Sequence, residues 1–259
     1  MLSHAYSEGV SLLDTAHMYG DAESRIGTLH TQGMRIVTKM PPLADASNQK
    51  LGKFLPSAFS ESLRNLKVDR VYGYLAHRSA DLTGEHGKEV RAFLDDLRAS
   101  GKAEKVGVSI YEAEELQEVL RVFPPDIVQL PLNVFDQRLL RDGTLAELKA
   151  AGVEVHVRSV FLQGLLLLDL ERIPSYFEPM RPLLAKWHAK AGEQGLTLPE
   201  ASLSFVRELP EVDKMIVGTE SLKQMREIIK AYRTPFTLDA TGLACHDPQW
   251  LDPRRWRGI

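Results

Sequence analysis

Residues 71–108 read VYGYLAHRSADLTGEHGKEVRAFLDDLRASGKAEKVGV, and this stretch decides the fold. It begins with a continuous apolar run, Val71–Ala76, and ends with a second one, Lys105–Val108. Between them, Glu85–Ser100 carries apolar side chains at helical spacing and stops at Gly101, a residue that favours the end of a helix. A strand, a helix and a second buried strand predict a right-handed βαβ unit with parallel strands.

The same alternation extends in both directions along the chain. Apolar runs predict strands at Val10–Leu13, Met34–Thr38, Val71–Ala76, Lys105–Val108, Ile127–Leu130, Val153–Val157 and Lys214–Val217. Amphipathic stretches predict helices at Phe54–Leu66, Glu85–Ser100, Glu112–Val122, Thr144–Ala151, Pro182–Gln194, Pro199–Glu208 and Ser221–Tyr232, the last with Ser221 as N-cap. This pattern indicates one α/β domain of the (β/α)8 barrel type over residues 1–259. An open doubly wound sheet would need a glycine-rich phosphate turn, which the sequence lacks.

The composition of the chain excludes several classes of function. Of 259 residues, 44% are hydrophobic and 26% charged, and 32 Lys and Arg stand against 35 Asp and Glu, a net charge of −3. This balance argues against nucleic acid or an anionic membrane surface as a partner. A single cysteine, Cys245, excludes an internal disulfide framework and a multi-cysteine metal site. The longest apolar run, Val160–Leu168, is too short to span a bilayer, and no signal peptide is visible, so we expect a cytoplasmic protein.

Polar side chains follow the first three predicted strands, where a barrel places its chemistry. Asp14 ends the first run with Tyr19 just beyond it, Lys39 ends the second and His77 ends the third. A free tyrosine has a pKa of about 10, but a nearby ammonium favours its phenolate form. Asp14 holding Lys39, and Lys39 polarising Tyr19, would make Tyr19 a usable proton donor, while His77 could orient a substrate carbonyl. With no metal-ligand cluster in the sequence, these side chains predict reduction of a carbonyl by an external hydride donor.

Each of these residues also has a purely structural interpretation. Asp14 could cap the following helix, and Lys39 could be a solvated charge at a strand end. Tyr19 could pack within a loop, and His77 could be a hydrogen-bonded residue of the barrel rim. Because the four residues lie at the ends of three successive predicted strands, we favour the catalytic interpretation.

Several segments of the chain resemble the aldo-keto reductases. GVSLLDTAHMYGDAE at 9–23, IVTKM at 36–40 and SLRNLKVDRVYGYLAH at 62–77 are similar to the segments that carry the family's catalytic residues. The resemblance implies a catalytic tetrad of Asp14, Tyr19, Lys39 and His77, with NADPH or NADH as the hydride donor. The string RSVFLQG at 158–164 resembles a bacterial subgroup of the family.

The segments GKAEKVGVS at 101–109, IVQLPLN at 127–133 and IVGTESLKQMREI at 216–228 resemble cofactor-binding segments of the same family. The resemblance implies that Ser109 and Gln129 bind the nicotinamide carboxamide. The loop around the pyrophosphate would include Ser159, Gly164 and Leu165. The segment that holds the adenosine ribose and its 2′-phosphate would include Gly218, Thr219, Glu220 and Gln224.

The chain departs from the family pattern at four cofactor positions. Ile110 replaces an asparagine beside the carboxamide, and Arg158 replaces the aromatic residue that stacks on the nicotinamide, although a guanidinium plane can also stack on a ring. Glu220 stands where many NADPH-dependent members have a basic residue, and its carboxylate would repel a 2′-phosphate and could accept from the ribose hydroxyls of NADH. Ile228 replaces an asparagine at the adenine edge. These changes weaken the family's default for NADPH.

The two ends of the chain carry further expectations. Leu2–Glu8 reads as the tail of a helix closed by Gly9, whereas the resembled family places a hairpin and a first barrel strand before that helix. Seven strands where closure needs eight predict a barrel that lacks its first strand, and its exposed edges could support self-association. The C-terminal residues 240–259 would form a tail whose Trp250 and Trp256 either shape the substrate pocket or pack on the barrel exterior.

The expected function is NAD(P)H-dependent reduction of an aldehyde or ketone, a small-molecule carbonyl of sugar-like or small aliphatic kind. The alternative is a cofactor-binding regulatory or inactive barrel with little turnover. The absent strand and Ile110 favour that alternative, and the intact tetrad disfavours it. A third interpretation is a shortened gene product without function.

Overall fold

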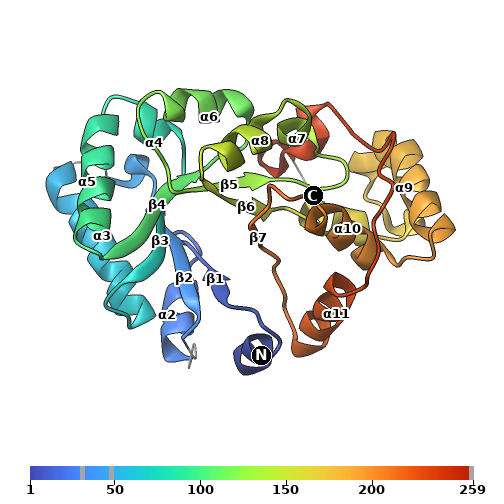
Figure 1. Cartoon of the computed structure of the whole chain (residues 1–259), viewed down its shortest axis with the longest axis horizontal. Coiled ribbons are helices and arrows are strands. Elements are labelled where there is room, and N and C mark those ends of the chain that lie inside the picture. The colour runs from blue at the N-terminus through green and yellow to red at the C-terminus, as the bar shows by residue number, and fades with distance from the viewer. Residues whose placement is uncertain (30–32, 47–49, 257–259) are drawn as a thin grey trace. The chain divides into compact units, whose positions relative to one another are not determined.

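A computed structural model describes residues 1–29, 33–46 and 50–256 (Figure 1). The chain divides into two compact units, Met1–Gln129 and Leu130–Ile259, and each is described by itself. The expectation of one domain over residues 1–259 therefore stays a prediction.

Parallel strands in sequence order form the centre of the first unit. They are β1 (Leu12–Asp14), β2 (Arg35–Lys39), β3 (Val71–Ala76), β4 (Ala103–Ser109) and β5 (Ile127–Pro131), which runs across the boundary between the units. The register pairs Asp14 with Val37, Lys39 with Leu75 and Ser109 with Gln129. Because the strands are parallel, their carboxyl ends lie at one edge of the sheet, and this edge carries the polar residues of the first unit.

Helices precede and connect these strands. They are α1 (Leu2–Ser7), α2 (Ala22–Thr28), α3 (Leu51–Leu66), α4 (Ala80–Thr83), α5 (Gly87–Ala99) and α6 (Ala113–Leu120), with the 3-10 helix η1 at Leu43–Ala46. Figure 1 shows α3 and α5 beside strands β3 and β4. The apolar face of α3 is buried, with the Phe59 ring 4.8 Å from that of Tyr74. Helix α2 can pack closely on α3 because a Cβ at Gly27 would lie 2.0 Å from the Asn65 carbonyl oxygen.

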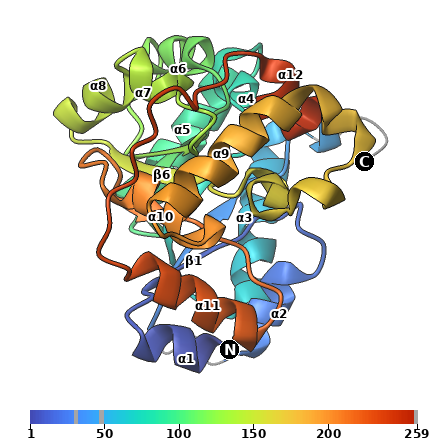
Figure 2. The same cartoon turned by 90° about the vertical axis from the view of Figure 1, so that its right-hand side faces the viewer.

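The second unit contains the end of β5 together with β6 (Glu154–Arg158) and β7 (Lys214–Met215). Its helices are α7 (Arg138–Arg141), α8 (Thr144–Ala150), α9 (Arg181–Glu193), α10 (Leu198–Arg207), α11 (Leu222–Tyr232) and α12 (Pro248–Leu251). The 3-10 helices are η2 (Leu162–Leu167), η3 (Leu170–Arg172), η4 (Ser175–Met180) and η5 (Pro253–Arg255). Figure 2 shows α9, α10 and α11 on the side of this unit that faces the viewer. Trp187 of α9 is the largest fully buried side chain, and its ring lies 6.4 Å from that of Phe135.

All seven predicted strands are present, with shifted ends. The first lies at Leu12–Asp14 rather than Val10–Leu13, and the last covers only the first two residues of Lys214–Val217. The predicted helices are also present, and Gly9 has the left-handed conformation (φ 88°) expected just after α1. The sequence did not predict α2, α4, α7 and α12. Helices α4, α7 and α12 have four residues each, which is too few to show a helical period, and the buried side chain of α2 is the charged Glu23, so α2 shows no apolar face.

Candidate active site

Asp14 and Lys39 form a shielded ion pair at the carboxyl ends of β1 and β2. The Lys39 Nζ lies 2.7 Å from Asp14 Oδ2 and donates to the Thr15 carbonyl oxygen at 2.9 Å. Lys39 is 1% exposed, so its ammonium needs these acceptors to stay charged. The structural interpretations of these two residues are therefore wrong: Lys39 is not a solvated charge, and the N-cap of α2 is Asp21 rather than Asp14.

Tyr19 and His77 lie beside this ion pair. Tyr19 belongs to the loop after β1 and is exposed, and Lys39 Nζ lies 5.3 Å from the centroid of its ring. His77 directly follows β3, and its ring meets that of Tyr19 edge-on at 6.0 Å between centroids. The backbone N–H of His17 donates to the Lys39 carbonyl oxygen at 3.1 Å, which ties the tyrosine loop to the end of β2. The structure thus brings together the four residues of the predicted tetrad, and their catalytic roles stay predictions.

Two of the expected cofactor ligands belong to this first unit. Ser109 and Gln129 are buried register partners at the ends of β4 and β5. The Gln129 side-chain nitrogen Nε2 donates to Asp14 Oδ1 at 2.8 Å, a contact that the sequence did not predict. Ile110, which replaces the family's asparagine, is fully buried, and its backbone N–H donates to the Gln129 carbonyl oxygen.

Glu23 of α2 is a buried charge that the sequence did not predict. This carboxylate is 3% exposed and accepts from the Thr38 hydroxyl at 2.6 Å, one residue before Lys39. Burial and the negative charge of Glu23 raise the pKa of Tyr74, the register partner of Thr38, far above its ordinary value. A glutamate near a helix start normally faces solvent, so no local signal distinguishes this one.

The other expected ligands belong to the second unit, and the first group lies on the loop after β6. Left-handed backbone conformations occur there at Ser159 (φ 61°), Leu162 (φ 46°), Gln163 (φ 54°) and Gly164 (φ 89°). The backbone N–H groups of Leu162 and Gly164 donate within this loop, to the carbonyl oxygens of Ser159 and Phe161, at 2.9 Å each. Arg158 donates to the Ser159 hydroxyl at 3.4 Å. Binding of a cofactor pyrophosphate by this loop stays a prediction.

Two hydrogen bonds fix the loop after β6 to other residues of the second unit. Asn133 donates to the Ser159 carbonyl oxygen at 3.1 Å, and the indole N–H of Trp187 donates to the Leu166 carbonyl oxygen at 3.0 Å. Leu165 lies between Ser159 and Leu166 in the sequence, and its side chain is buried. The left-handed backbone is thus fixed by its surroundings rather than by glycine alone.

The second group lies between β7 and α11, at Gly218, Thr219, Glu220 and Gln224. The Gln224 side-chain oxygen accepts from the Glu220 backbone N–H at 2.8 Å, and Ser221 accepts from the Gln224 backbone N–H at 3.1 Å. Ser221 is therefore the N-cap of α11, as predicted. The Glu220 carboxylate is exposed, and the first turn of α11 contains no acidic residue.

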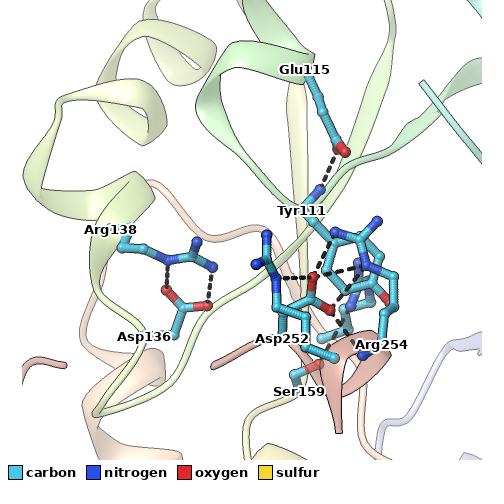
Figure 3. A network of polar contacts seen from close by, with 9 residues as sticks. Tyr111, Glu115, Asp136, Arg138, Ser159, Asp252 and Arg254 are labelled. Carbon is cyan, nitrogen blue, oxygen red and sulfur yellow. Dashed lines mark hydrogen bonds and ion pairs between the residues drawn. The ribbon is translucent and has the colours of Figure 1, made fainter. Parts of the chain in front are cut away.

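Two carboxylate–arginine pairs lie near the C-terminal tail in the second unit (Figure 3). Asp136 accepts from Arg138 at 2.8 and 2.9 Å, and the buried Asp252 accepts from Arg254 at 2.8 to 3.0 Å. Burial acts to raise the pKa of Asp252, but the hydrogen bonds from Arg254 outweigh it and hold that pKa below the ordinary value.

The two tryptophans of the tail pack against η4. The Phe177 ring lies 6.3 Å from that of Trp250 and 4.7 Å from that of Trp256. Residues 257–259 of the predicted tail lie outside the described part of the chain. Whether the tail borders the substrate stays a prediction.

Within the described residues, no group of histidine, cysteine and carboxylate side chains could hold a metal ion. In the same part of the chain, no helix is long and apolar enough to cross a membrane.

Comparison with known proteins assigns the family. The model of the aldo/keto reductase family matches residues 1–242, so the chain belongs to this family. It is an oxidoreductase whose cofactor is a nicotinamide dinucleotide, NADPH or NADH, and whose general reaction is carbonyl reduction. The resemblance stated from sequence is confirmed.

Two curated relatives are matched over half or more of their own length. An NADH-specific methylglyoxal reductase of Escherichia coli (strain K12) is 23% identical over 261 residues, which cover 88% of this chain and 80% of that protein. A 6-dehydroglucose reductase of Novosphingobium aromaticivorans is 30% identical over 153 residues, which cover 51% of this chain and 50% of that protein.

Solved structures support the fold class. An aldo-keto reductase from Bacillus halodurans, in its holo form, covers 93% of this chain and 83% of its own, with a TM-score of 0.74 and 18% identity. The α/β class of the (β/α)8 type is confirmed, with seven parallel strands among the described residues where a closed barrel has eight.

Proposed function

We propose that this protein reduces an aldehyde or ketone and that Tyr19 protonates the carbonyl oxygen. The observation that carries the proposal is the buried Lys39, which lies 2.7 Å from Asp14 and 5.3 Å from the Tyr19 ring. A cation held at this place stabilises negative charge on the phenolic oxygen as the proton leaves. His77, beside the Tyr19 ring, would hydrogen-bond the same carbonyl and orient it.

NADH or NADPH, when bound, would supply the hydride. The first unit offers Ser109 and Gln129 for its carboxamide, and the second unit offers the left-handed loop from Ser159 to Leu165 for the pyrophosphate. The Arg158 guanidinium offers a flat cation for the nicotinamide ring. These residues bind and orient, and the proton comes from Tyr19.

A Tyr19→Phe variant tests the proposed proton donor. It keeps the ring beside Lys39 and His77 but removes the hydroxyl, so we expect kcat to fall by about 10²–10⁴-fold. The affinity for NADH or NADPH, followed by tryptophan fluorescence, should stay within about twofold because ground-state binding does not need the proton. Tyr6→Phe, on the exposed surface of α1, is the matched control and should change neither quantity.

The outcomes separate the proposal from its alternative. Undiminished turnover in Tyr19→Phe would refute Tyr19 as the proton donor. A folded chain that binds nucleotide but reduces no member of a carbonyl panel would instead support a cofactor-binding module with little turnover.

We also propose a small aliphatic or sugar-like carbonyl as the substrate. The names of the two relatives support this range, since one reduces methylglyoxal and the other 6-dehydroglucose. A panel of α-oxoaldehydes, short aldehydes and oxidised hexoses, compared by kcat/KM, tests it. Higher kcat/KM for large aromatic aldehydes would contradict it.

We propose that the cofactor preference is for NADH. Glu220 supports this preference, because its exposed carboxylate lies at the start of α11, where it would repel a 2′-phosphate. The Escherichia coli relative is NADH-specific by name.

Charge reversal at Glu220 tests the preference. Glu220→Arg should strengthen NADPH binding relative to NADH by about tenfold, because it replaces a repulsion with an ion pair. Glu193→Arg makes the same charge change on the exposed surface of α9 and should leave the ratio unchanged. An unchanged ratio of dissociation constants in Glu220→Arg would show that another residue selects the cofactor.

A further inference from the structure

Both oxygens of the Asp14 carboxylate accept from buried side chains. Lys39 Nζ donates to Oδ2 at 2.7 Å, and Gln129 Nε2 donates to Oδ1 at 2.8 Å. Lys39 and Gln129 are each 1% exposed and the Asp14 side chain is 9% exposed, so water has little access to either bond. In such a shielded place a hydrogen bond fixes geometry and shares charge more strongly than on the surface.

We propose that Gln129 is a positioning residue for the proton donor and acts through Asp14. Its amide N–H takes up part of the carboxylate's negative charge and holds the carboxylate in the orientation that binds Lys39. The negative charge of Asp14 then destabilises a Tyr19 phenolate less, and the positive charge of Lys39 stabilises it more. The inference rests on the proposed role of Tyr19.

The same bond determines which end of Gln129 faces a ligand. An ionised carboxylate only accepts hydrogen bonds, so Asp14 requires the amide nitrogen of Gln129 and leaves the amide oxygen Oε1 for another partner. A carboxamide bound at this site would therefore meet an acceptor. One side chain would thus contact the cofactor and the ion pair together.

Charged and titratable groups near Tyr19 come from three strand ends of the first unit and from the loop of Tyr19 itself. Lys39 of β2 and His77 after β3 lie against the ring, Asp14 of β1 lies behind Lys39, and His17 belongs to the same loop as Tyr19. The proposal predicts that loss of the Gln129 donor alters the ionisation of Tyr19 through Asp14 and Lys39.

The test measures the ionisation of Tyr19 in the protein without nucleotide. Tyrosinate absorbance near 295 nm is titrated, and the Tyr19→Phe titration is subtracted to isolate Tyr19. Gln129→Glu keeps the length of the side chain but adds a carboxyl that is ionised at the alkaline pH of the titration. We expect Tyr19 to ionise about one pH unit higher in this variant, because negative charge is added beside Asp14. Gln129→Met only removes the donor and should give a smaller shift in the same direction.

Gln137→Met is the matched control. Gln137 is also a buried glutamine, and its Nε2 donates to the Val134 carbonyl oxygen at 2.7 Å in the second unit. This variant loses a buried hydrogen bond without touching Asp14, so the ionisation of Tyr19 should not move. Near-ultraviolet circular dichroism checks that each variant is folded.

Unchanged Tyr19 ionisation in folded Gln129→Glu and Gln129→Met would overturn the proposal. Weaker nucleotide binding alone, with no shift, would do so as well, because it would leave Gln129 as a carboxamide ligand only. Failure of the proposed function is a separate result, since it appears as undiminished turnover in Tyr19→Phe whatever the titrations show.

Discussion

At the scale of single residues, buried polar side chains of the first unit meet at two places. Lys39 and Gln129 meet at Asp14, and Thr38 meets Glu23 on the other face of β2. Consecutive residues of a strand point to opposite faces, so Thr38 and Lys39 link the same strand to α2 and to the tyrosine loop. The Glu23–Thr38 bond thus anchors the helix that follows Tyr19.

Loss of the Thr38 hydroxyl should therefore be costly. Thr38→Val keeps the shape but leaves a buried carboxylate oxygen without its donor, so we expect a loss of about 1–3 kcal/mol in the free energy of unfolding, measured with urea. Thr28→Val is the control, because the Thr28 hydroxyl donates to the Arg25 carbonyl oxygen on the exposed surface of α2, and its cost should stay within about 0.5 kcal/mol. Equal costs for the two variants would show that the Glu23 bond stabilises nothing.

At the scale of elements, the ends of helices α10 and α11 show two kinds of N-cap. Thr197 and Glu200 of α10 form a capping box, in which the Thr197 N–H donates to the Glu200 carboxylate at 2.9 Å. The Thr197 hydroxyl and backbone N–H hold the pKa of Glu200 below its ordinary value. Helix α11 has Ser221 as its cap and the neutral Gln224 three residues on.

The two caps should respond differently to acid. A carboxyl with a lowered pKa stabilises the folded state above its unfolded pKa, and this stabilisation is lost as the pH falls through the folded pKa. Thr197→Ala should cost about 1 kcal/mol at pH 7 and less in acid, where Glu200 is protonated. Ser221→Ala should cost a similar amount at both pH values, because Gln224, three residues after Ser221, is a neutral amide. Urea unfolding at pH 7 and at a pH below the lowered pKa of Glu200 measures both, and a pH-independent cost of Thr197→Ala would contradict the role of the Glu200 charge.

At the scale of the whole molecule, the described residues supply seven parallel strands, and within them the pairings leave β1 with β2 alone and β7 with β6 alone. A strand that pairs on one side presents free backbone donors and acceptors to other chains. Val10, just before β1, adds an exposed apolar side chain to that edge.

We predict self-association through these edges. Size-exclusion chromatography with light scattering should show a mass above 29.0 kDa that rises with concentration. Val10→Lys should reduce the association by placing a charge at the β1 edge, whereas Val122→Lys, at an exposed site before β5, should not. A monodisperse monomer with a melting temperature well above the ordinary mesophile range would contradict the prediction.

The sequence by itself determined the order of strands and helices and the parallel sheet, and it predicted that Asp14, Tyr19, Lys39 and His77 lie together. Continuous apolar runs and helical periods are local patterns in the sequence. The position where a strand ends determines which polar residue lies at the carboxyl edge of the sheet. Four-residue helices such as α4 and α7 were not predicted, because a single turn shows no helical period.

Only the tertiary structure decided which polar groups meet. Gln129 lies 115 residues from Asp14, and Thr38 lies 15 residues from Glu23, so no local pattern could reveal either bond. The burial of Lys39 likewise depends on neighbouring strands and not on its own segment. A buried charge acquires its partners from whatever the fold places beside it, and that is a property of packing rather than of spacing along the chain.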